Sequence, residues 1–362
     1  MSHVPLMTYP EAMVVGLIQG VTELFPVSSL GHNVLIPALV GGSWAQALNV
    51  AKPESPYLAY IVGLHVATAI GLLIYFWRDW VRIIRGFFTS IRDRDITTSD
   101  QKLAWMIIVA TIPVGLAGLL FEHPFRVLFG KPILAAVFLV ANGVILFCGE
   151  KFRTRKSRQA DVEVAAERRA ASVPAELQRE PAAGVAAVSM AAAADGSAIA
   201  GPPPRRPGHG SHAAVKPDSR TLRAAERAAA IRADSRLSKL DYLQAILIGS
   251  AQILALLAGI SRDGVTMVSG MWRGLSREDA ARFAFLLATP VILAAGALKL
   301  KDLITLGHGI YGPILAGSIL SGIGAYVSVR YLVRYFQTRT LTPFAIYCFL
   351  FGLGSILYLH FK

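Results

Sequence analysis

Residues 19–32 read QGVTELFPVSSLGH and place Gln, Glu, two Ser and a His within an otherwise apolar segment. Apolar residues flank this stretch at 12–18 and at 34–40. Polar and ionisable side chains are costly at membrane depth and are usually kept there for a function. A second stretch, SRDGVT at 261–266, is its counterpart far downstream. We expect the two stretches to form turns that meet inside a bilayer and hold a phosphate group between them.

The composition is that of a membrane protein. The 362 residues are 54% hydrophobic and only 16% charged, and their mean hydropathy is +0.51, values too apolar for a soluble domain. The formal charge of +13 does not point to nucleic acid, because excess Lys and Arg in membrane proteins usually mark cytoplasmic loops. Six apolar runs are long enough to cross about 30 Å of hydrocarbon as helices. These predicted spans are 57–77, 103–121, 132–148, 280–298, 310–332 and 341–359.

Residues 11–40 form two apolar arms that are interrupted by a Pro and a Gly. Each arm is too short to cross a bilayer alone, which favours a re-entrant helix–turn–helix buried in protein or facing water. The same pattern returns at 241–275, where SRDG interrupts a second apolar segment. Three spans follow each re-entrant element. The sequence therefore predicts an all-α polytopic membrane protein with a first membrane repeat at 1–150 and a second at 240–362.

Basic segments predict the orientation, because Lys and Arg are enriched in cytoplasmic loops. The loop expected after the first span carries Arg78, Arg82, Arg85, Arg92 and Arg94. With that loop in the cytoplasm, the first re-entrant pair enters the membrane from outside and the second from inside. This arrangement is an inverted-topology repeat, which places the tips of the broken helices and the functional site near the bilayer midplane.

Residues 151–239 differ from the rest of the chain in composition. They are rich in Ala, Arg, Pro and Ser and contain 17 Lys and Arg against 9 Asp and Glu, a net charge of +8. Low hydrophobicity combined with Pro, Gly and charge favours disorder. Two pieces rich in Ala, Arg and Glu, 160–171 and 221–235, are compatible with surface helices. We interpret 151–239 as a basic, disordered cytoplasmic linker.

Gln19 and Glu23 lie four residues apart and therefore share one face of a helix. Both offer oxygen ligands that suit a hard cation such as Mg²⁺ or Ca²⁺, or that can position a water molecule. Polar residues in membranes also form hydrogen bonds between helices, which is the alternative for Gln19. That alternative suits Glu23 less well, because a carboxylate in an apolar segment is usually functional.

Pro26 and Gly31 bracket a turn that leaves Ser28 or Ser29 to cap the helical arm that follows. A helix N-terminus with free amides and hydroxyl groups is a ready site for an anion, although capping alone also accounts for two serines. His32 lies one turn further along and can act as a nucleophile or as a general acid–base group. The alternative for His32 is a packed hydrogen-bond donor.

The second turn contributes Ser261, Arg262 and Thr266. An arginine is costly at membrane depth, and its planar fork matches two oxygen atoms of a phosphate. Local neutralisation of Arg262 by Asp263 is the alternative. His65, in the first span, is expected to border the site. Together the two turns offer a carboxylate, hydroxyls, an imidazole and a guanidinium, a set that suits transfer of a phosphoryl group to water.

The motifs resemble those of the undecaprenyl-diphosphate phosphatase family, the bacitracin-resistance type of integral membrane phosphatase. The family's E/Q-x-x-x-E motif matches residues 19–23, and its P-V-S-S-x-G-H motif matches residues 26–32 in full. Its P-G-x-S-R-S-x-x-T motif matches residues 258–266 with two departures, since Ala258 replaces Pro and Asp263 replaces Ser. The resemblance covers both predicted membrane repeats and leaves out the linker.

The resemblance implies an enzyme that hydrolyses undecaprenyl diphosphate to undecaprenyl phosphate and inorganic phosphate. This reaction recycles a lipid carrier for peptidoglycan synthesis and confers resistance to bacitracin. The resemblance also implies a multi-pass protein of the bacterial cytoplasmic (inner) membrane, in contact with membrane lipids, whose site faces the outer, periplasmic side. The oligomeric state is open between a monomer and a homodimer.

The resemblance also assigns roles to individual residues. Glu23 and Gln19 would hold the divalent cation, Mg²⁺ or Ca²⁺, or a water molecule. Ser29, with Ser28, would bind or attack the terminal phosphate, and His32 would be a nucleophile or an acid–base group, so the nucleophile stays open between Ser29 and His32. The remaining phosphate contacts would come from the second turn. Arg262 would clamp the diphosphate, and Ser261 and Thr266 would also bind the phosphate.

A transporter is the competing class. Inverted repeats with broken helices at the midplane are also a transporter architecture, and the same pocket could bind and flip a polyprenyl phosphate. Glu23 and His32 separate the two hypotheses, because passage of an anion needs no base whereas hydrolysis does. The sequence therefore favours a phosphatase over a flippase.

Overall fold

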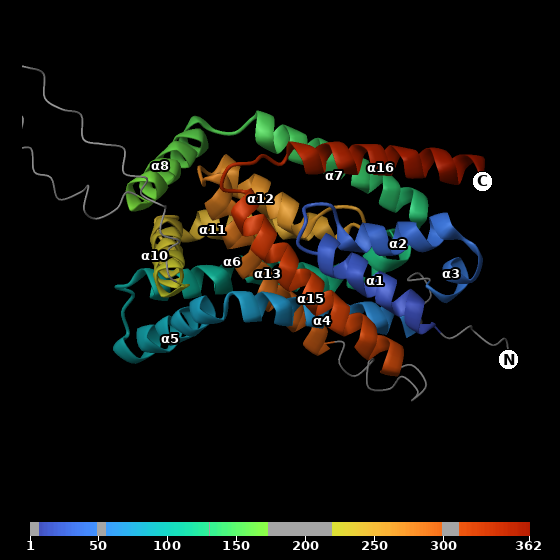
Figure 1. Ribbon diagram of the computed structural model, residues 1–362, viewed down its shortest axis with the longest axis horizontal. Helices are drawn as coiled ribbons and strands as arrows, with labels where there is room; N and C mark the ends of the chain where they lie inside the picture. The colour runs from blue at the N-terminus through green and yellow to red at the C-terminus, as the bar shows by residue number, and fades with distance from the viewer. Residues whose placement is uncertain (1–6, 49–55, 130, 173–218, 299–310) are drawn as a thin grey trace, which may run out of the picture. The chain divides into compact units, whose positions relative to one another are not determined.

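The computed structural model describes residues 7–48, 56–129, 131–172, 219–298 and 311–362, and every regular element in these residues is a helix (Figure 1). The chain divides into two compact units, Met1–Asp161 with Ala230–Lys362, and Val162–Ala229. The first unit contains the apolar helices and the two turns. Its helices are α1 (Tyr9–Thr22), α2 (Ser29–Val40), α3 (Gly42–Ala47), α4 (Pro56–Tyr75), α5 (Trp77–Asp93), α6 (Ser99–Phe129), α7 (Pro132–Lys151), α11 (Tyr242–Ser250), the short 3₁₀ helix η1 (Ala251–Leu256), α12 (Arg262–Trp272), α13 (Arg277–Leu298), α15 (Tyr311–Tyr335) and α16 (Thr342–Phe361).

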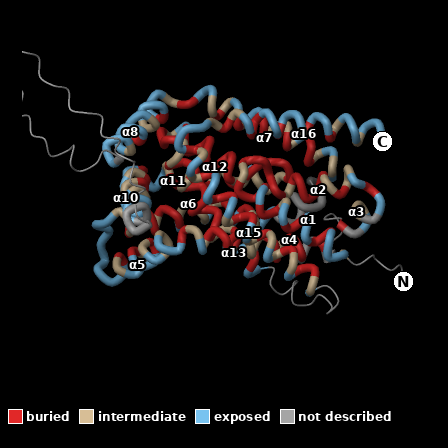
Figure 2. The backbone as a smooth tube through the Cα atoms, viewed as in Figure 1, coloured by how far each residue is buried: buried red, intermediate tan, exposed pale blue. Residues whose placement is uncertain are grey.

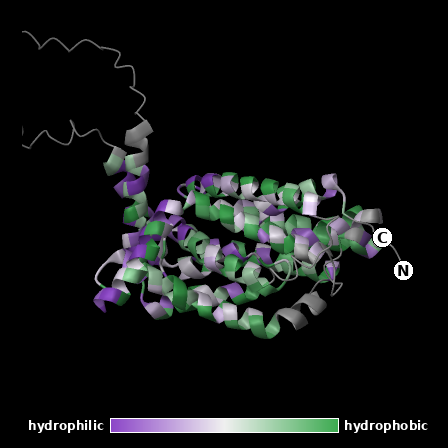
Figure 3. Ribbon diagram, turned by 90° about the horizontal axis from the view of Figure 1, so that it is seen from below, coloured by the Kyte–Doolittle hydropathy of each residue, from purple (hydrophilic) through white to green (hydrophobic). Residues whose placement is uncertain are grey.

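Apolar helices of membrane-spanning length confirm the predicted class. Among the described residues, five helices have the length and hydropathy needed to cross a bilayer, and α4 with α5 makes a sixth if the bent pair is one span. Hydrophobic residues cover the length of these helices, and hydrophilic ones gather mainly toward one end (Figure 3). The chain is therefore an all-α polytopic membrane protein. The relation of its two halves as an inverted repeat stays a prediction.

Two broken helical elements form the centre of the first unit. Helix α1 starts with a capping box between Thr8 and Glu11 and ends at Thr22, and its 14 residues reach only about 21 Å at 1.5 Å per residue. Helix α2 follows after a turn. In the second element, α11 and η1 lead through a turn into α12. Both elements therefore present a turn and a fresh helix N-terminus within the protein, where non-helical backbone is tolerated.

The same residue type caps both helices that leave these turns. Ser28 Oγ accepts a hydrogen bond from the Gly31 amide at 3.2 Å, and Ser261 Oγ accepts one from the Gly264 amide at 3.2 Å. Ser28 also has φ at 66°, in the left-handed region that a non-glycine residue rarely adopts. The first turn is thus held in a strained backbone conformation by its neighbours.

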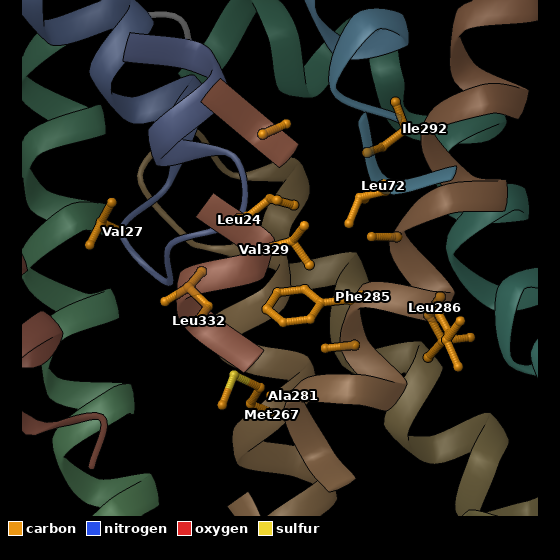
Figure 4. Packing of buried hydrophobic residues seen from close by; sticks show 14 of the residues in the cluster. Leu24, Val27, Leu72, Met267, Ala281, Phe285, Leu286, Ile292, Val329 and Leu332 are labelled. Atoms are coloured by element: carbon orange, nitrogen blue, oxygen red, sulfur yellow. The ribbon is translucent and has the colours of Figure 1, made fainter. Parts of the chain in front are cut away.

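Small residues let the helices around the turns approach closely. A Cβ atom added to Gly16 of α1 would lie 2.2 Å from the carbonyl oxygen of Gly317 in α15. One added to Gly20 would lie 2.4 Å from the carbonyl oxygen of Ser321 in the same helix. Buried residues line the inner helices of the unit, and exposed ones follow α5 and α16 (Figure 2). Leu24 and Val27 of the first turn lie in the same buried cluster as Phe285 of α13 (Figure 4). The turns therefore rest on packed apolar side chains.

The charged segments can be compared with the sequence-based expectation. The basic segment after the first span, expected as a loop, is the helix α5, because its apolar residues recur at helical spacing. The ends of the expected linker are the helices α8 (Arg155–Ser172) and α10 (Ser219–Leu237), which contain the two pieces that the sequence analysis found compatible with surface helices. The part of the linker at 173–218 lies outside the described residues.

Ion pairs attach both linker ends to the first unit. Asp161 of α8 lies 2.6 Å from Arg277 of α13 and 2.8 Å from Arg153. Asp234 of α10 is fully buried and lies 2.8 Å from Arg282 of α13. A buried charge is stable only when paired, so these contacts hold the helix ends firmly. Residues 151–161 and 230–239, which the sequence analysis assigned to the linker, lie in the same compact unit as the apolar helices.

Candidate active site

Glu23 is the centre of the polar network at the first turn. Its side chain is only 5% exposed. Oε2 accepts hydrogen bonds from Gln19 Nε2 at 2.7 Å and from the Ser29 hydroxyl, and His65 Nε2 lies 3.3 Å away. Oε1 accepts a hydrogen bond from an Arg262 Nη atom at 3.1 Å. One carboxylate therefore joins the first turn, the second turn and α4.

Arg262 connects the two turns. It is the first residue of α12, and its Nε also donates to Asp263 Oδ1 at 3.2 Å. The neutralising contact considered for Asp263 is thus present, and it coexists with the contact to Glu23. Asp263 is almost fully buried, and its second oxygen, Oδ2, has no hydrogen-bond partner among the described residues. The guanidinium lies between two carboxylates, which fixes the plane of its fork.

The hydroxyl groups of the predicted phosphate site are engaged with the backbone. Ser28 Oγ accepts from the Gly259 amide of the second turn at 3.2 Å, in addition to its capping bond. Ser261 Oγ caps α12, and the Thr266 hydroxyl donates to the Arg262 carbonyl oxygen at 2.7 Å. All three residues lie at the two turns. Ser28 links the turns directly, and Ser29 is the serine whose hydroxyl faces the carboxylate.

His32 lies in a different environment from the other candidates. Its Nδ1 is 2.7 Å from the Ser28 carbonyl oxygen and its Nε2 is 2.8 Å from the Tyr347 hydroxyl. A carbonyl oxygen only accepts, so in the neutral ring Nδ1 carries the proton and Nε2 accepts from Tyr347. The ring also stacks on Phe351 with centroids 5.2 Å apart. The structure thus holds His32 in one tautomer and ties it to the first turn through the Ser28 carbonyl oxygen.

Three residues at the site were not predicted from the sequence, namely Asn33, Asn142 and Tyr347. Asn33 Nδ2 donates to Gln19 Oε1 at 2.6 Å. Asn142 of α7 is fully buried, donates to the Pro26 carbonyl oxygen at 3.0 Å and accepts from the Ser261 amide at 3.0 Å. A lone polar residue in the apolar run 132–148 was a usable signal for Asn142. Tyr347 ends the stretch TPFAIY at 342–347, which also resembles the family, but tyrosine is common in membrane helices and no role was assigned to it.

Replacing Asn142 by alanine is expected to loosen the pairing of the two turns. The Pro26 carbonyl and the Ser261 amide would both lose a buried partner, at a cost of roughly 1–3 kcal/mol each. We expect a lower thermal unfolding temperature in detergent and a fall of about tenfold in phosphate release, since a small misplacement of reacting groups is costly.

Ser355→Ala is the matched control for Asn142→Ala. Ser355 is also buried, but among the described residues its hydroxyl donates only to the Phe351 carbonyl oxygen within α16, so this variant should change neither property appreciably. Asn142→Ala with wild-type activity and stability would contradict a role in holding the turns together.

Glu23 and Gln19 are the residues whose oxygen atoms would hold a divalent cation. The described part of the chain holds no cluster of three or more His, Cys, Asp or Glu side chains at metal-binding spacing. Both Glu23 oxygens and Gln19 Oε1 already accept hydrogen bonds from protein groups. These two residues would suit a Mg²⁺ ion only if it bound mainly through waters and the phosphates of a substrate. They do not fit a cage made of protein ligands alone.

Comparison with known proteins agrees with the motifs. The family model described as bacitracin resistance protein BacA matches residues 12–171 and 219–354. The chain is 53% identical over 354 residues to the undecaprenyl-diphosphatase of Mycolicibacterium paratuberculosis, covering 98% of both chains. It is 50% identical over 358 residues to undecaprenyl-diphosphatase 1 of Frankia casuarinae, covering 95% of this chain and 96% of that one. It is 34% identical over 354 residues to undecaprenyl-diphosphatase 2 of Chromobacterium violaceum, covering 96% of this chain and 98% of that one. The resemblance stated from the motifs is confirmed, and the chain belongs to the bacitracin resistance protein BacA family.

Proposed function

We propose that this protein is an undecaprenyl-diphosphatase, which hydrolyses undecaprenyl diphosphate to undecaprenyl phosphate and inorganic phosphate. The observation that carries the proposal is the contact between Glu23 and Arg262, 3.1 Å apart, at the tips of two broken helices inside a membrane unit. A buried carboxylate and an arginine from opposite turns supply a proton acceptor and an anion clamp at one point. The names of the relatives supply the substrate.

The site suits a lipid substrate because it lies within the membrane unit. A polyprenyl tail can stay in the hydrocarbon while its diphosphate reaches the two turns. In the cell the reaction returns the lipid carrier to peptidoglycan synthesis and removes the target of bacitracin. The proposal includes the bacterial cytoplasmic membrane and a site open to the outer side, as the resemblance to the family implies. The basic segments predicted to face the cytoplasm support the orientation of the chain.

Charge neutralisation dominates phosphoryl transfer, and this site has little positive charge of its own. Arg262 already faces the carboxylates of Glu23 and Asp263. An incoming diphosphate adds further negative charge, so a divalent cation held by Glu23, Gln19 and the phosphates would supply the missing positive charge. The N-termini of α2 and α12 also face the turns and favour an anion there. Ser28, Ser261 and Thr266 lie at these helix ends and would contact the phosphate.

The geometry favours Ser29 over His32 as the nucleophile. The Ser29 hydroxyl donates to Glu23, so the carboxylate can take its proton as Oγ attacks the terminal phosphorus. The bond from phosphorus to the bridging oxygen then breaks, undecaprenyl phosphate leaves, and water cleaves the phosphoserine. His32 would act as an acid–base group through Nε2. Acid quenching of enzyme mixed with substrate labelled in the terminal phosphate separates the two nucleophiles, because phosphoserine survives acid and phosphohistidine does not.

Tyr347→Phe tests the environment of His32. The variant keeps the ring that stacks on His32 and removes only the hydroxyl that donates to Nε2. Loss of one hydrogen bond of about 0.5–1.5 kcal/mol should lower kcat roughly three- to tenfold with little change in KM. Tyr358→Phe, on the same helix and half exposed, should leave both constants unchanged. Equal kinetics for the two variants would remove the Tyr347–His32 pair from the mechanism.

Phosphate release from undecaprenyl diphosphate by the purified protein tests the function itself. We expect steady release that depends on Mg²⁺ or Ca²⁺. The alternative, a polyprenyl-phosphate flippase that uses the same pocket, has no support in the names of the relatives. Folded protein that binds the lipid without releasing phosphate, and that moves it across vesicle membranes, would favour that alternative.

A further inference from the structure

Helix α5, which follows α4, runs at almost a right angle to it. Tyr60–Tyr75 and Trp77–Asp93 are bent by 86° with respect to each other. The first helix carries no Asp, Glu, Lys or Arg between those bounds, whereas α5 carries six in 17 residues. If α4 crosses the bilayer, a polar helix perpendicular to it lies along the membrane plane. Helices of this kind occupy the boundary between headgroups and acyl chains.

One face of α5 is fixed against α6. A Cβ atom on Gly86 would lie 2.8 Å from the Asp100 backbone, so the two helices touch there. Ser90 Oγ accepts a hydrogen bond from Trp105 Nε1 at 2.9 Å, and Arg82 pairs with Asp100 at 2.8 Å. These contacts define which face of α5 points away from the protein.

The opposite face is apolar along its middle and basic along one edge. Its apolar stripe recurs every three or four residues, as one helical face requires, and each member is 50–64% exposed: Trp77, Val81, Ile84, Phe88 and Ile91. Beside the stripe, Arg78, Arg85 and Arg92 recur every seven residues and are exposed, so they form one row. We name these eight residues the outer face of α5.

We propose that the outer face of α5 binds the headgroup region of anionic phospholipids. The apolar stripe would enter the acyl boundary, and the arginine row would contact lipid phosphates. Charge complementarity supports this occupant, since an arginine row beside an apolar stripe matches a layer of phosphates above hydrocarbon. The right angle to α4 places the face parallel to that layer. The contact would be distinct from the substrate site at the two turns.

Hydrogen exchange of the full-length protein in lipid nanodiscs tests the proposal. One set of discs contains phosphatidylcholine alone, and the other contains phosphatidylcholine with about one-third phosphatidylglycerol. Each arginine near an anionic membrane surface strengthens the binding of its segment to that surface by roughly fivefold. We expect the amides of α5 to exchange at least about tenfold more slowly in anionic discs, and Arg78→Gln/Arg85→Gln/Arg92→Gln to abolish that difference.

The matched control removes the same charge elsewhere. Arg155→Gln/Arg158→Gln/Arg168→Gln lowers the net charge equally but lies in α8, so it should keep the tenfold difference at α5. Equal exchange of α5 in both kinds of disc would overturn the proposal. So would equal behaviour of the two triple variants. Protection that depends on protein concentration rather than lipid charge would assign the outer face to a second copy of the chain and also overturn it.

Quenching of tryptophan fluorescence by brominated lipids gives an independent readout of depth. Trp77 lies on the outer face, and its contribution is the difference between the intact protein and Trp77→Phe. Bromine near the headgroup should quench this contribution more strongly than bromine near the chain end. No quenching by either lipid, or stronger quenching by the deep bromine, would contradict a position at the interface.

Discussion

Glu23→Gln is expected to lower the rate of phosphate release by about 1,000-fold while the protein stays folded. The glutamine keeps the shape of the side chain and can still pair with Gln19 and Ser29. It cannot take a proton from Ser29, and a positioned base contributes roughly 10²- to 10⁴-fold. It also leaves Arg262 without one of its two carboxylate partners. The measurement is kcat for phosphate release, together with the thermal unfolding temperature.

Glu11→Gln is the control for this prediction. Glu11 is also a buried glutamate of α1, but it accepts from Thr8 in the capping box at the far end of the helix. Glutamine also fits this position of a capping box, so the replacement should change neither the thermal unfolding temperature nor kcat appreciably. Glu23→Gln within tenfold of wild-type kcat would exclude Glu23 as the base and favour a role in cation binding alone.

The sequence was sufficient to predict the membrane class and the residues of the two turns. A carboxylate, an arginine and paired serines inside apolar segments are conspicuous because burial of such groups is costly. Residue type left the first cap open between Ser28 and Ser29, and the structure shows Ser28 and Ser261 as the two caps. The expected meeting of the two turns is confirmed, since Ser28 Oγ accepts a hydrogen bond from the Gly259 amide.

Other parts of the site depend on tertiary contacts that no local pattern encodes. Asn142 bridges the turns from α7, and Tyr347 reaches His32 across 315 positions of the chain. Periodicity shows which face of a helix is apolar and does not show which helix it packs against. The apolar residues of α5 recur every three or four positions, which indicates a helix. Its arginines nevertheless led to the prediction of a loop.

The linker shows the same limit for charged residues. Composition favours disorder for 151–239 as a whole, because composition averages over a segment. Asp161 and Asp234 are ordinary acidic residues by that measure. In the structure they are the partners of Arg277 and Arg282 in α13, and a buried arginine requires such a partner. The ends of the linker are therefore ordered by contacts with residues more than forty positions away.

Arg262→Lys is expected to lower kcat/KM by about 100- to 1,000-fold, although it keeps the positive charge. The guanidinium contacts Glu23 through Nη and Asp263 through Nε, and a lysine cannot reproduce that planar fork. The ammonium group would pair with one carboxylate and leave the other unpaired in a buried site. Loss of one donor to the charge that develops in the transition state costs roughly 2.7–4 kcal/mol. Kinetics of phosphate release over a range of substrate concentrations give the value.

Arg273→Lys controls for a general effect of arginine at the ends of α12. Arg273 lies just after that helix and bonds only Ser269 among the described side chains, so its replacement should leave kcat/KM within twofold. The double variant Glu23→Gln/Arg262→Lys should lose far less than the product of the single losses, because the two side chains act on one another. Losses that multiply would show that the two residues act independently, and the 3.1 Å contact would then be a structural ion pair rather than the centre of the reaction.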